Sequence, residues 1–376
     1  MRSALVIASV LVATTPAFAD EAKDDQYSGA TVIFARGSAL IRVDPRGRGE
    51  TEVAKLAAKV SVRALRTDAR GRVLLADLGG KWSWMKLDGA QTTLTDLPCA
   101  DGPAQLAVDG ACVLCRSTTS PTGSVIVTLH TGKTTAVEIP SPGARLIGQG
   151  AQRRLVWADA AGVWSAPPLD TKKKQRLAPE APLRSFLPSP DGSRAVGVYR
   201  DILHEGKQTK PADLLMTFQL DGQAARRKAI KAGVPIEWSH DNQWVLLQDS
   251  SKACIMGAAG GEYKCWKGFT GASIASDGRW ALVLGSRTSA EPDKQSKQSK
   301  KSKQSKQSKK SKTPEPMNED ENPGTEVTAT DDVEVPPPSG PLALYRAELA
   351  GPYSKAPVRI VSIVDGAAVW IPGALR

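Results

Sequence analysis

Short apolar segments joined by tight polar turns recur along most of the chain. One copy runs from Leu65 to Leu75 around a turn at Gly71, and another runs from Leu187 to Val198 around Ser189-Pro190-Asp191-Gly192. Short apolar runs bounded by Gly, Asp, Asn and Pro are typical of β-hairpins. No amphipathic helical run of 12 or more residues competes with this pattern. We therefore expect an all-β protein.

The turns recur at a nearly constant interval. They stand at positions 71, 110, 151, 192, 242 and 278, which are 39, 41, 41, 50 and 36 residues apart. This is the repeat length of a four-stranded β-propeller blade. About 302 residues of the chain carry the repeat, and at roughly 43 residues per blade they predict seven blades, with six and eight as alternatives.

The first and last segments of the repeat are incomplete in complementary ways. Thr31–Ala35 and Ala39–Val43 begin a blade that has no innermost strand, whereas Ala367–Ile371 is a strand with no blade after it. We expect the C-terminal strand to complete the first blade. This pairing closes the ring and removes an open sheet edge.

Two copies also carry a recognisable turn motif. Ser189-Pro190-Asp191-Gly192-Ser193-Arg194 and Trp238-Ser239-His240-Asp241-Asn242-Gln243-Trp244 resemble the repeats of TolB-like and WD-type β-propellers. The resemblance implies an exported propeller of the cell envelope that serves as a binding platform. The α/β domain that precedes the propeller in TolB has no counterpart in this chain. The motif is architectural and assigns no binding residue.

Two segments differ from the repeat in composition. Residues 1–19 read as a secretory signal, with an apolar run and an Ala17-Phe18-Ala19 cleavage site, and 20–26 as a flexible tail. Residues 293–340 are first rich in Lys, Ser and Gln and then acidic and Pro-rich, which predicts a disordered insert. The propeller then comprises 27–292 and 341–376. We expect a protein of the periplasm or the extracellular space.

The positive charge belongs to the propeller. The whole chain has a net charge of +11, while the insert carries 9 Lys and 9 acidic residues. The propeller keeps 39 basic and 26 acidic residues. Some basic residues, such as Lys172-Lys173-Lys174 and Arg226-Arg227-Lys228, stand at predicted outermost strands, where they discourage edge-to-edge pairing. The alternative is attraction to anionic envelope components.

Three long connections fall between the second and third strands of their blades. They are 116–123, 200–213 and the insert, and by this register they share one face of the ring. Long loops on one face of a rigid scaffold are a common place for binding. The predicted partner-binding loop comprises Arg200, Asp201, His204, Glu205, Lys207 and Lys210. His240, by contrast, occupies a repeat turn, where we expect an exposed side chain without a binding role.

The five cysteines predict two disulfides. Cys254 and Cys265 flank a turn symmetrically, as a cross-strand pair does. Cys112 and Cys115 are three apart in a strand, so their side chains point to opposite faces, too far apart for a bond. Cys115 is nearer than Cys112 to Cys99, which predicts the second bond and leaves Cys112 as a buried free thiol.

The motifs searched for favour binding over catalysis. There is no G-x-S-x-G nucleophile elbow and no second cysteine pair at zinc-ligand spacing. We expect a monomeric, non-enzymatic platform without catalytic residues, cofactor, metal or transmembrane segment. Its expected partner is an envelope protein, with anionic polysaccharide or lipid headgroups as alternatives and nucleic acid excluded. The alternative functions are a glycan or small-ligand binder and an enzyme with a central-channel site.

Overall fold

The computed structural model describes the repeat region of the chain and leaves the predicted signal, tail and insert outside the described residues. The described residues are 29–57, 60–87, 93–119, 123–138, 143–178, 183, 185–205, 208–221, 226–231, 233–249, 252–259, 263–286, 342–349 and 356–373.

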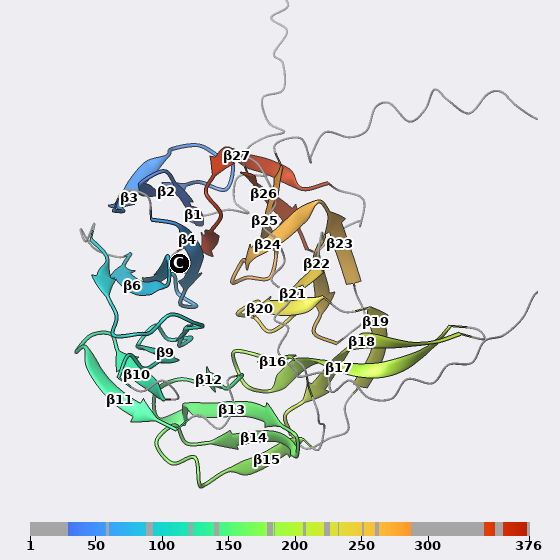
Figure 1. Ribbon diagram of the computed structural model, residues 1–376. Helices are drawn as coiled ribbons and strands as arrows, with labels where there is room; N and C mark the ends of the chain where they lie inside the picture. The colour runs from blue at the N-terminus through green and yellow to red at the C-terminus, as the bar shows by residue number, and fades with distance from the viewer. Residues whose placement is uncertain are drawn as a thin grey trace, which may run out of the picture.

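The described strands form seven four-stranded antiparallel sheets arranged as blades around a central axis (Figure 1). This confirms the predicted all-β propeller and its blade number. The blades, each from the innermost to the outermost strand, are β28-β1-β2-β3, β4-β5-β6-β7, β8-β9-β10-β11, β12-β13-β14-β15, β16-β17-β18-β19, β20-β21-β22-β23 and β24-β25-β26-β27. We number them blades 1 to 7 in this order.

The strand bounds follow the hairpin pattern of the sequence. Blades 1 to 3 contain β28 (Ala368–Ile371), β1 (Thr31–Arg36), β2 (Ala39–Val43), β3 (Thr51–Lys55), β4 (Val62–Thr67), β5 (Val73–Leu78), β6 (Lys81–Lys86), β7 (Thr95–Asp96), β8 (Gln105–Leu106), β9 (Cys112–Arg116), β10 (Ser124–Thr128) and β11 (Lys133–Val137). Blades 4 and 5 contain β12 (Arg145–Ile147), β13 (Arg154–Asp159), β14 (Gly162–Ala166), β15 (Gln175–Ala178), β16 (Ser185–Pro188), β17 (Arg194–Glu205), β18 (Gln208–Gln219) and β19 (Arg226–Lys231). Blades 6 and 7 contain β20 (Val234–Trp238), β21 (Trp244–Asp249), β22 (Lys252–Gly257), β23 (Tyr263–Lys267), β24 (Phe269–Ile274), β25 (Trp280–Ser286), β26 (Leu342–Glu348) and β27 (Val358–Val364). A single 3-10 turn, η4 (Gly150–Gln152), is the one helical element in the described part.

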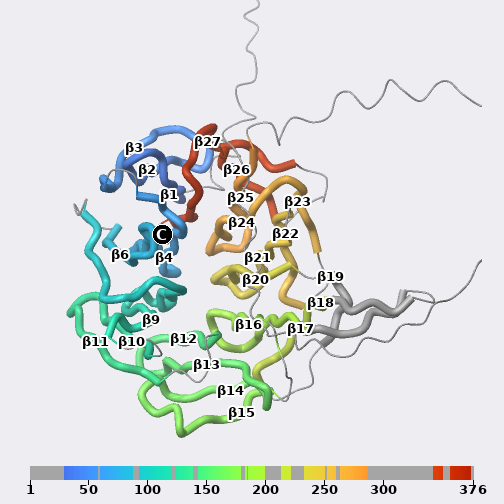
Figure 2. Tube along the Cα trace, in the orientation of Figure 1, coloured from blue at the N-terminus to red at the C-terminus, as the bar shows by residue number. Residues whose placement is uncertain are grey.

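The C-terminal strand closes the ring as predicted. β28 pairs antiparallel with β1, with Val32 opposite Trp370 and Phe34 opposite Ala368. Figure 2 shows the last strand, in red, beside the blue first blade. The inner edge of β1 is therefore covered by the other end of the described chain.

The apolar core is divided among the junctions between blades. Seven clusters of buried side chains each join two neighbouring blades. Trp157 and Trp280 belong to two of them, and both are buried. Each blade is thus held mainly by apolar packing against its neighbours, as expected where one blade cannot bury both faces alone.

Left-handed backbone at one repeat position shapes the turn between the first two strands of six blades. The residues concerned are Gly71, Gly110, Gly150, Gly192, Asn242 and Gly278, with φ between 52° and 74°. Five are glycines, since φ in this range is strained for other residues, and Asn tolerates it best. At Gly192 an added Cβ would also lie 2.3 Å from the Cδ1 atom of Ile147 on the preceding blade. The turn predicted at 151 is centred on Gly150 instead.

The disulfides join the predicted cysteines. Cys254 and Cys265 are directly paired residues of β22 and β23, with their Cα atoms 4.1 Å apart. Cys99 and Cys115 have Cα atoms 5.7 Å apart, where Cys99 forms an isolated bridge beside the end of β9. Cys112 is a buried free cysteine, and burial raises the pKa of its thiol.

The three segments predicted as long connections join the strands expected from the sequence. They link β9 to β10, β17 to β18 and β25 to β26, each the second and third strands of a blade. In a ring of antiparallel blades these links share one face with the links that enter each innermost strand; we call it the loop face. The other face, which carries the turns between first and second strands, we call the turn face.

One of these connections was predicted wrongly as a loop. Residues 200–213 belong mostly to extended strands β17 and β18, whose pairing continues from Tyr199 opposite Leu214 to Glu205 opposite Gln208. Pairing satisfies backbone hydrogen bonds that a loop would leave to water. The polar residues of the segment conceal this extended pairing in the sequence.

Candidate functional site

One repeat position places six side chains around the central channel. It lies five residues before the left-handed turn residue, at the inner edge of each blade. The six are Arg66 on β4, Gln105 on β8, Arg145 on β12, Leu187 on β16, Glu237 on β20 and Ser273 on β24. We call them the channel ring.

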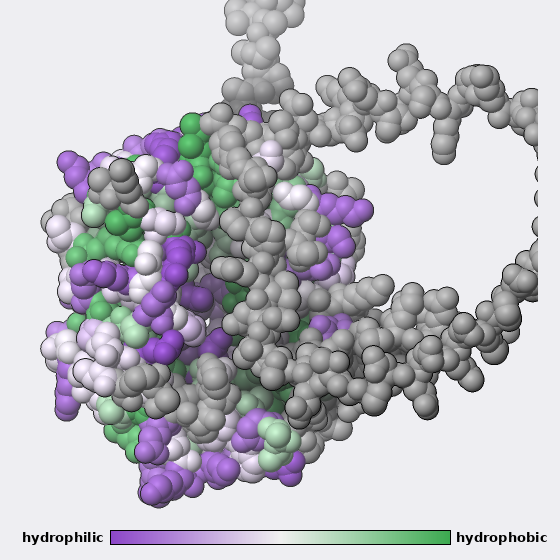
Figure 3. Space-filling model, viewed as in Figure 1, coloured by the Kyte–Doolittle hydropathy of each residue, from purple (hydrophilic) through white to green (hydrophobic). Residues whose placement is uncertain are grey.

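A cavity of about 930 Å³ lies in the channel on the side of blades 2 to 6. Five of the six channel-ring residues line it; Ser273 does not. It extends from Val234 and Pro103, near the loop face, to Pro190 and His240, in the turns of the opposite face. Figure 3 shows hydrophilic side chains around a hollow near the centre of the ring. Its volume is in the range of small-molecule sites.

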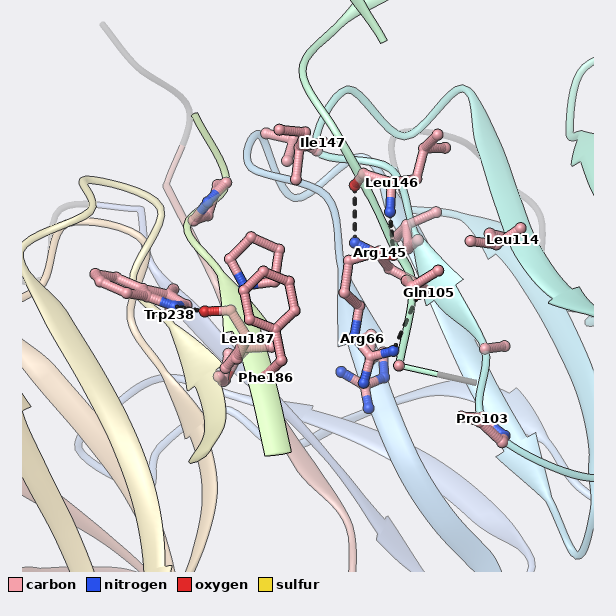
Figure 4. Close-up of a pocket in the computed structure, with 18 of the residues that line it drawn as sticks. Arg66, Pro103, Gln105, Leu114, Arg145, Leu146, Ile147, Phe186, Leu187 and Trp238 are labelled. Atoms are coloured by element: carbon pink, nitrogen blue, oxygen red, sulfur yellow. Dashed lines mark hydrogen bonds between the residues drawn. The ribbon is translucent and has the colours of Figure 1, made fainter. Parts of the chain in front are cut away.

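Three arginines line the cavity, Arg66, Arg116 and Arg145, and two of them lie close together. Arg66 and Arg145 lie side by side on one wall (Figure 4), and the positive charge of Arg66 contributes to lowering the pKa of Arg145, after burial itself. Neither guanidinium forms an ion pair within the described part of the chain. The hydrogen bond of the Arg145 side chain is to the carbonyl oxygen of Ala144, at 3.2 Å. Two such cations at one place favour an anion between them.

Glu237 is the one carboxyl group among the described residues that line the cavity. Burial raises its pKa to about 7, although Arg66, the backbone N–H of Ile274 and the hydroxyl group of Ser273 all favour its ionised form. Its Oε2 atom accepts a hydrogen bond from the Ile274 N–H at 2.9 Å. Near neutral pH the side chain is therefore divided between its charged and neutral forms.

His240 also lines the cavity, which corrects the expectation of an exposed turn residue. The turn of blade 6 borders the channel, and His240 is half-buried there. Burial lowers its pKa despite the nearby charges of Asp68 and Asp241. A neutral imidazole is thus favoured at pH 7, able to donate or accept a hydrogen bond.

Three buried polar atoms of the cavity have no hydrogen-bond partner among the described residues. They are the Nε atom of Arg66, the Oγ atom of Ser185 and the Nδ1 atom of His240. Buried polar groups are paired in the great majority of cases. The described residues therefore leave three polar groups beside the cavity unsatisfied.

The predicted partner-binding residues lie away from this cavity. Arg200, Asp201, His204 and Glu205 belong to β17 and Lys210 to β18, while Lys207 lies outside the described residues. Their role in binding stays a prediction.

Sequence reasoning missed Arg66, Arg145 and Glu237, although their fixed offset from the turn residue was a usable signal. In the described part, no group of three or more His, Cys, Asp and Glu side chains is arranged to hold a metal, and no helix has the length and apolarity to span a membrane.

Comparisons with solved structures show similarity to other propellers. A putative TolB from Agrobacterium tumefaciens has 13% identity and a TM-score of 0.41, over 63% of this chain and 87% of that one. Hydrazine synthase of Kuenenia stuttgartiensis has 12% identity and a TM-score of 0.41, over 59% and 73%. The dihydro-heme d1 dehydrogenase NirN has 15% identity and a TM-score of 0.44, over 68% and 58%. No family model and no curated protein matches the chain.

These neighbours correct one expectation. The prediction that the protein is not an enzyme was wrong as an inference from its fold, because propellers of similar structure include a synthase and a dehydrogenase. The absence of a nucleophile elbow and of zinc-ligand spacing says nothing of ionisable groups such as Glu237 and His240, which the closed ring brings to one cavity.

Proposed function

We propose that this protein binds a small anionic ligand in the central channel of its propeller. The observation that carries the proposal is the pair Arg66 and Arg145, which lie together in a large cavity without an ion-pair partner among the described residues. Keeping two like charges partly buried costs free energy unless an opposite charge is supplied. A carboxylate or phosphate group supplies that charge and matches the planar donors of arginine.

The other lining groups support a ligand that also forms hydrogen bonds. The hydroxyl of Ser185 and the Nδ1 atom of His240 are unpartnered in the described part. Both belong to the cavity that contains the two arginines. A ligand with one anionic group and further polar atoms would use all of them.

We also propose that the protein works outside the cytoplasm. Its two disulfides support this, because thiols are kept reduced in the cytosol of most organisms. The predicted signal segment agrees with that location. Small anions of the cell envelope are then the relevant ligands.

Isothermal titration calorimetry with inorganic phosphate and acetate tests the binding proposal. We expect binding to the wild-type protein and at least a tenfold loss in Arg66→Gln and in Arg145→Gln. Arg70→Gln is the matched control, since Arg70 is an exposed residue of the same blade as Arg66 and its replacement changes the net charge equally. Equal affinity in all four proteins, or no binding to the wild type, would overturn the proposal.

A second function, binding of an envelope protein, is supported by the loop face. The strand ends joined by the β9–β10, β17–β18 and β25–β26 links lie on that face, and β17 and β18 form an extended hairpin there. Cross-linking in envelope extract, with the full chain compared with variants lacking 293–340 or 201–212, tests it. Unchanged cross-linked partners in both variants would contradict it.

A further inference from the structure

The cavity has two chemically different walls. Arg66 and Arg145 lie on one side in Figure 4, whereas Leu187, Phe186 and Trp238 lie on the other. The first wall belongs to blades 2 and 4, and the second to blades 5 and 6. The two guanidinium groups therefore face the large apolar side chains across the channel, while Glu237, His240 and Ser185 add polar groups to the second wall.

The apolar wall continues to the loop face through consecutive residues of β20. Val234, Pro235 and Ile236 all line the cavity. Val234 is 58% exposed, which makes it one of four large hydrophobic side chains that are exposed in the described part, and the only one of those four in the cavity. Leu187 is half-buried in the channel ring. Apolar surface gathered in a pocket rather than scattered over a protein marks a binding surface.

The side-chain amide of Gln105, which also lines the cavity, is not available to a ligand. Both ends of its side-chain amide are used on the backbone of Leu146, at 2.8 and 2.7 Å. The amide is thus occupied within the protein, and the charged donors that line this side of the cavity are Arg66, Arg145 and, at the end of β9, Arg116. A ligand needs one anionic end and no second charge to match Arg66 and Arg145.

We propose that the ligand is an amphipathic anion, with its carboxylate or phosphate group between Arg66 and Arg145 and an apolar body along Leu187, Ile236 and Val234. This inference rests on the proposed binding of an anion in the channel and adds the nature of the rest of the ligand. The exposed Val234 places the end of the apolar body at the mouth on the loop face. The ligand enters from that face.

A series of straight-chain carboxylates tests this inference. Acetate, hexanoate and decanoate share one head group and differ only in apolar length, and decanol lacks the charge. Binding is measured by calorimetry below the concentrations at which the longer chains form micelles. We expect the affinity of the wild-type protein to rise up to about fourfold per buried methylene group, and decanol to bind far more weakly than decanoate.

Variants separate the two walls. Val234→Ser and Leu187→Ser should weaken decanoate at least fivefold and leave acetate unchanged, whereas Arg66→Gln should weaken both. Val358→Ser is the control, because Val358 is 52% exposed on the outermost strand of blade 7 and lies outside the cavity. Since Val234 is already exposed, its replacement should not disturb folding.

The outcomes distinguish the two proposals. Equal affinities for acetate and decanoate, both lost in Arg66→Gln, would overturn the amphipathic ligand and leave anion binding intact. Decanoate affinity that is unchanged in Arg66→Gln and matched by decanol would overturn anion binding as well. Equal weakening by Val234→Ser and Val358→Ser would contradict the assignment of the apolar wall.

Discussion

The side chain of Gln105 forms two hydrogen bonds with the backbone of Leu146 on the next blade. Its Nε2 atom donates to the Leu146 carbonyl oxygen at 2.8 Å, and its Oε1 atom accepts from the Leu146 N–H at 2.7 Å. β12 is only three residues long, and its channel-side edge has no neighbouring strand. Gln105 thus takes the place of a strand at that edge, next to Arg145.

Replacing Gln105 by alanine should therefore destabilise the junction of blades 3 and 4. Leaving the N–H and carbonyl groups of Leu146 unpaired in a half-buried site should lower the free energy of unfolding by roughly 2 kcal/mol. Urea denaturation followed by tryptophan fluorescence measures this change. Gln105→Glu is the control, because it keeps the acceptor and should cost less. A loss below about 0.5 kcal/mol in Gln105→Ala would show that the two bonds are dispensable.

Glu237 repeats the same contact between blades 6 and 7. It occupies the channel-ring position of Gln105, and its Oε2 atom accepts from the N–H of Ile274 at 2.9 Å, as Oε1 of Gln105 does from Leu146. A protonated glutamic acid is close in shape to glutamine. The neutral form of Glu237 can therefore serve the blade junction, while the ionised form opposes burial.

Stability should accordingly depend on the pH through Glu237. Its pKa of about 7 in the folded protein lies above the ordinary value of 4.5. The folded state therefore binds more protons between these values, and the stabilisation present below pH 4.5 is lost as the pH rises towards 7. The whole effect of this group is at most roughly 3 kcal/mol. In Glu237→Gln this contribution should vanish.

Urea denaturation at pH 5 and pH 8 checks the sign. The wild-type protein should lose more stability between the two values than Glu237→Gln, and the two proteins should be closest at pH 5. A wild-type protein that gains stability relative to the variant as the pH rises would show that the ionised carboxylate is the favoured form. Glu348→Gln, a substitution on strand β26, controls for the general effect of removing a carboxylate.

Much of the fold, but little of the channel, was evident from the sequence. Turns such as that at Gly192 need a left-handed residue, and this local requirement repeats visibly along the chain. The channel-ring position carries Arg, Gln, Leu, Glu and Ser, because side chains that face an open channel are not constrained by packing. Its chemistry depends on which blades become neighbours in space. Arg66 and Glu237 are far apart in sequence and interact only across the closed ring.

His240 illustrates the same limit. In sequence it replaces the proline of a repeat turn, and turns are normally exposed. This turn, however, borders the channel, and His240 contributes to the cavity. In β17 and β18 the sequence predicted a loop, but the two strands stay paired beyond the point where their apolar residues end.

Thiol labelling should distinguish the states of the five cysteines. With Cys99–Cys115 and Cys254–Cys265 bonded and Cys112 buried, the native protein should react with no maleimide reagent. The denatured, unreduced protein should take up one label, and the denatured, reduced protein five. Mass spectrometry counts the labels and locates the first at Cys112. Two or more labels before reduction would contradict the pairing.

The C-terminal strand offers the sharpest test of ring closure. All four residues of β28 are buried, and they pair with β1 at the start of the described chain. A chain ending at residue 366 loses this strand, exposes the inner edge of β1 and leaves the apolar clusters on both sides of blade 1 incomplete. We expect it to lose cooperative unfolding or to aggregate through the open edge.

A chain ending at residue 373 keeps β28 and should unfold as the full chain does. Adding a synthetic peptide of residues 356–376 to the shorter chain should restore cooperative unfolding, because the missing strand then pairs in trans. If the chain ending at 366 is as stable as the full chain, the covering of β1 by β28 does not hold the ring together.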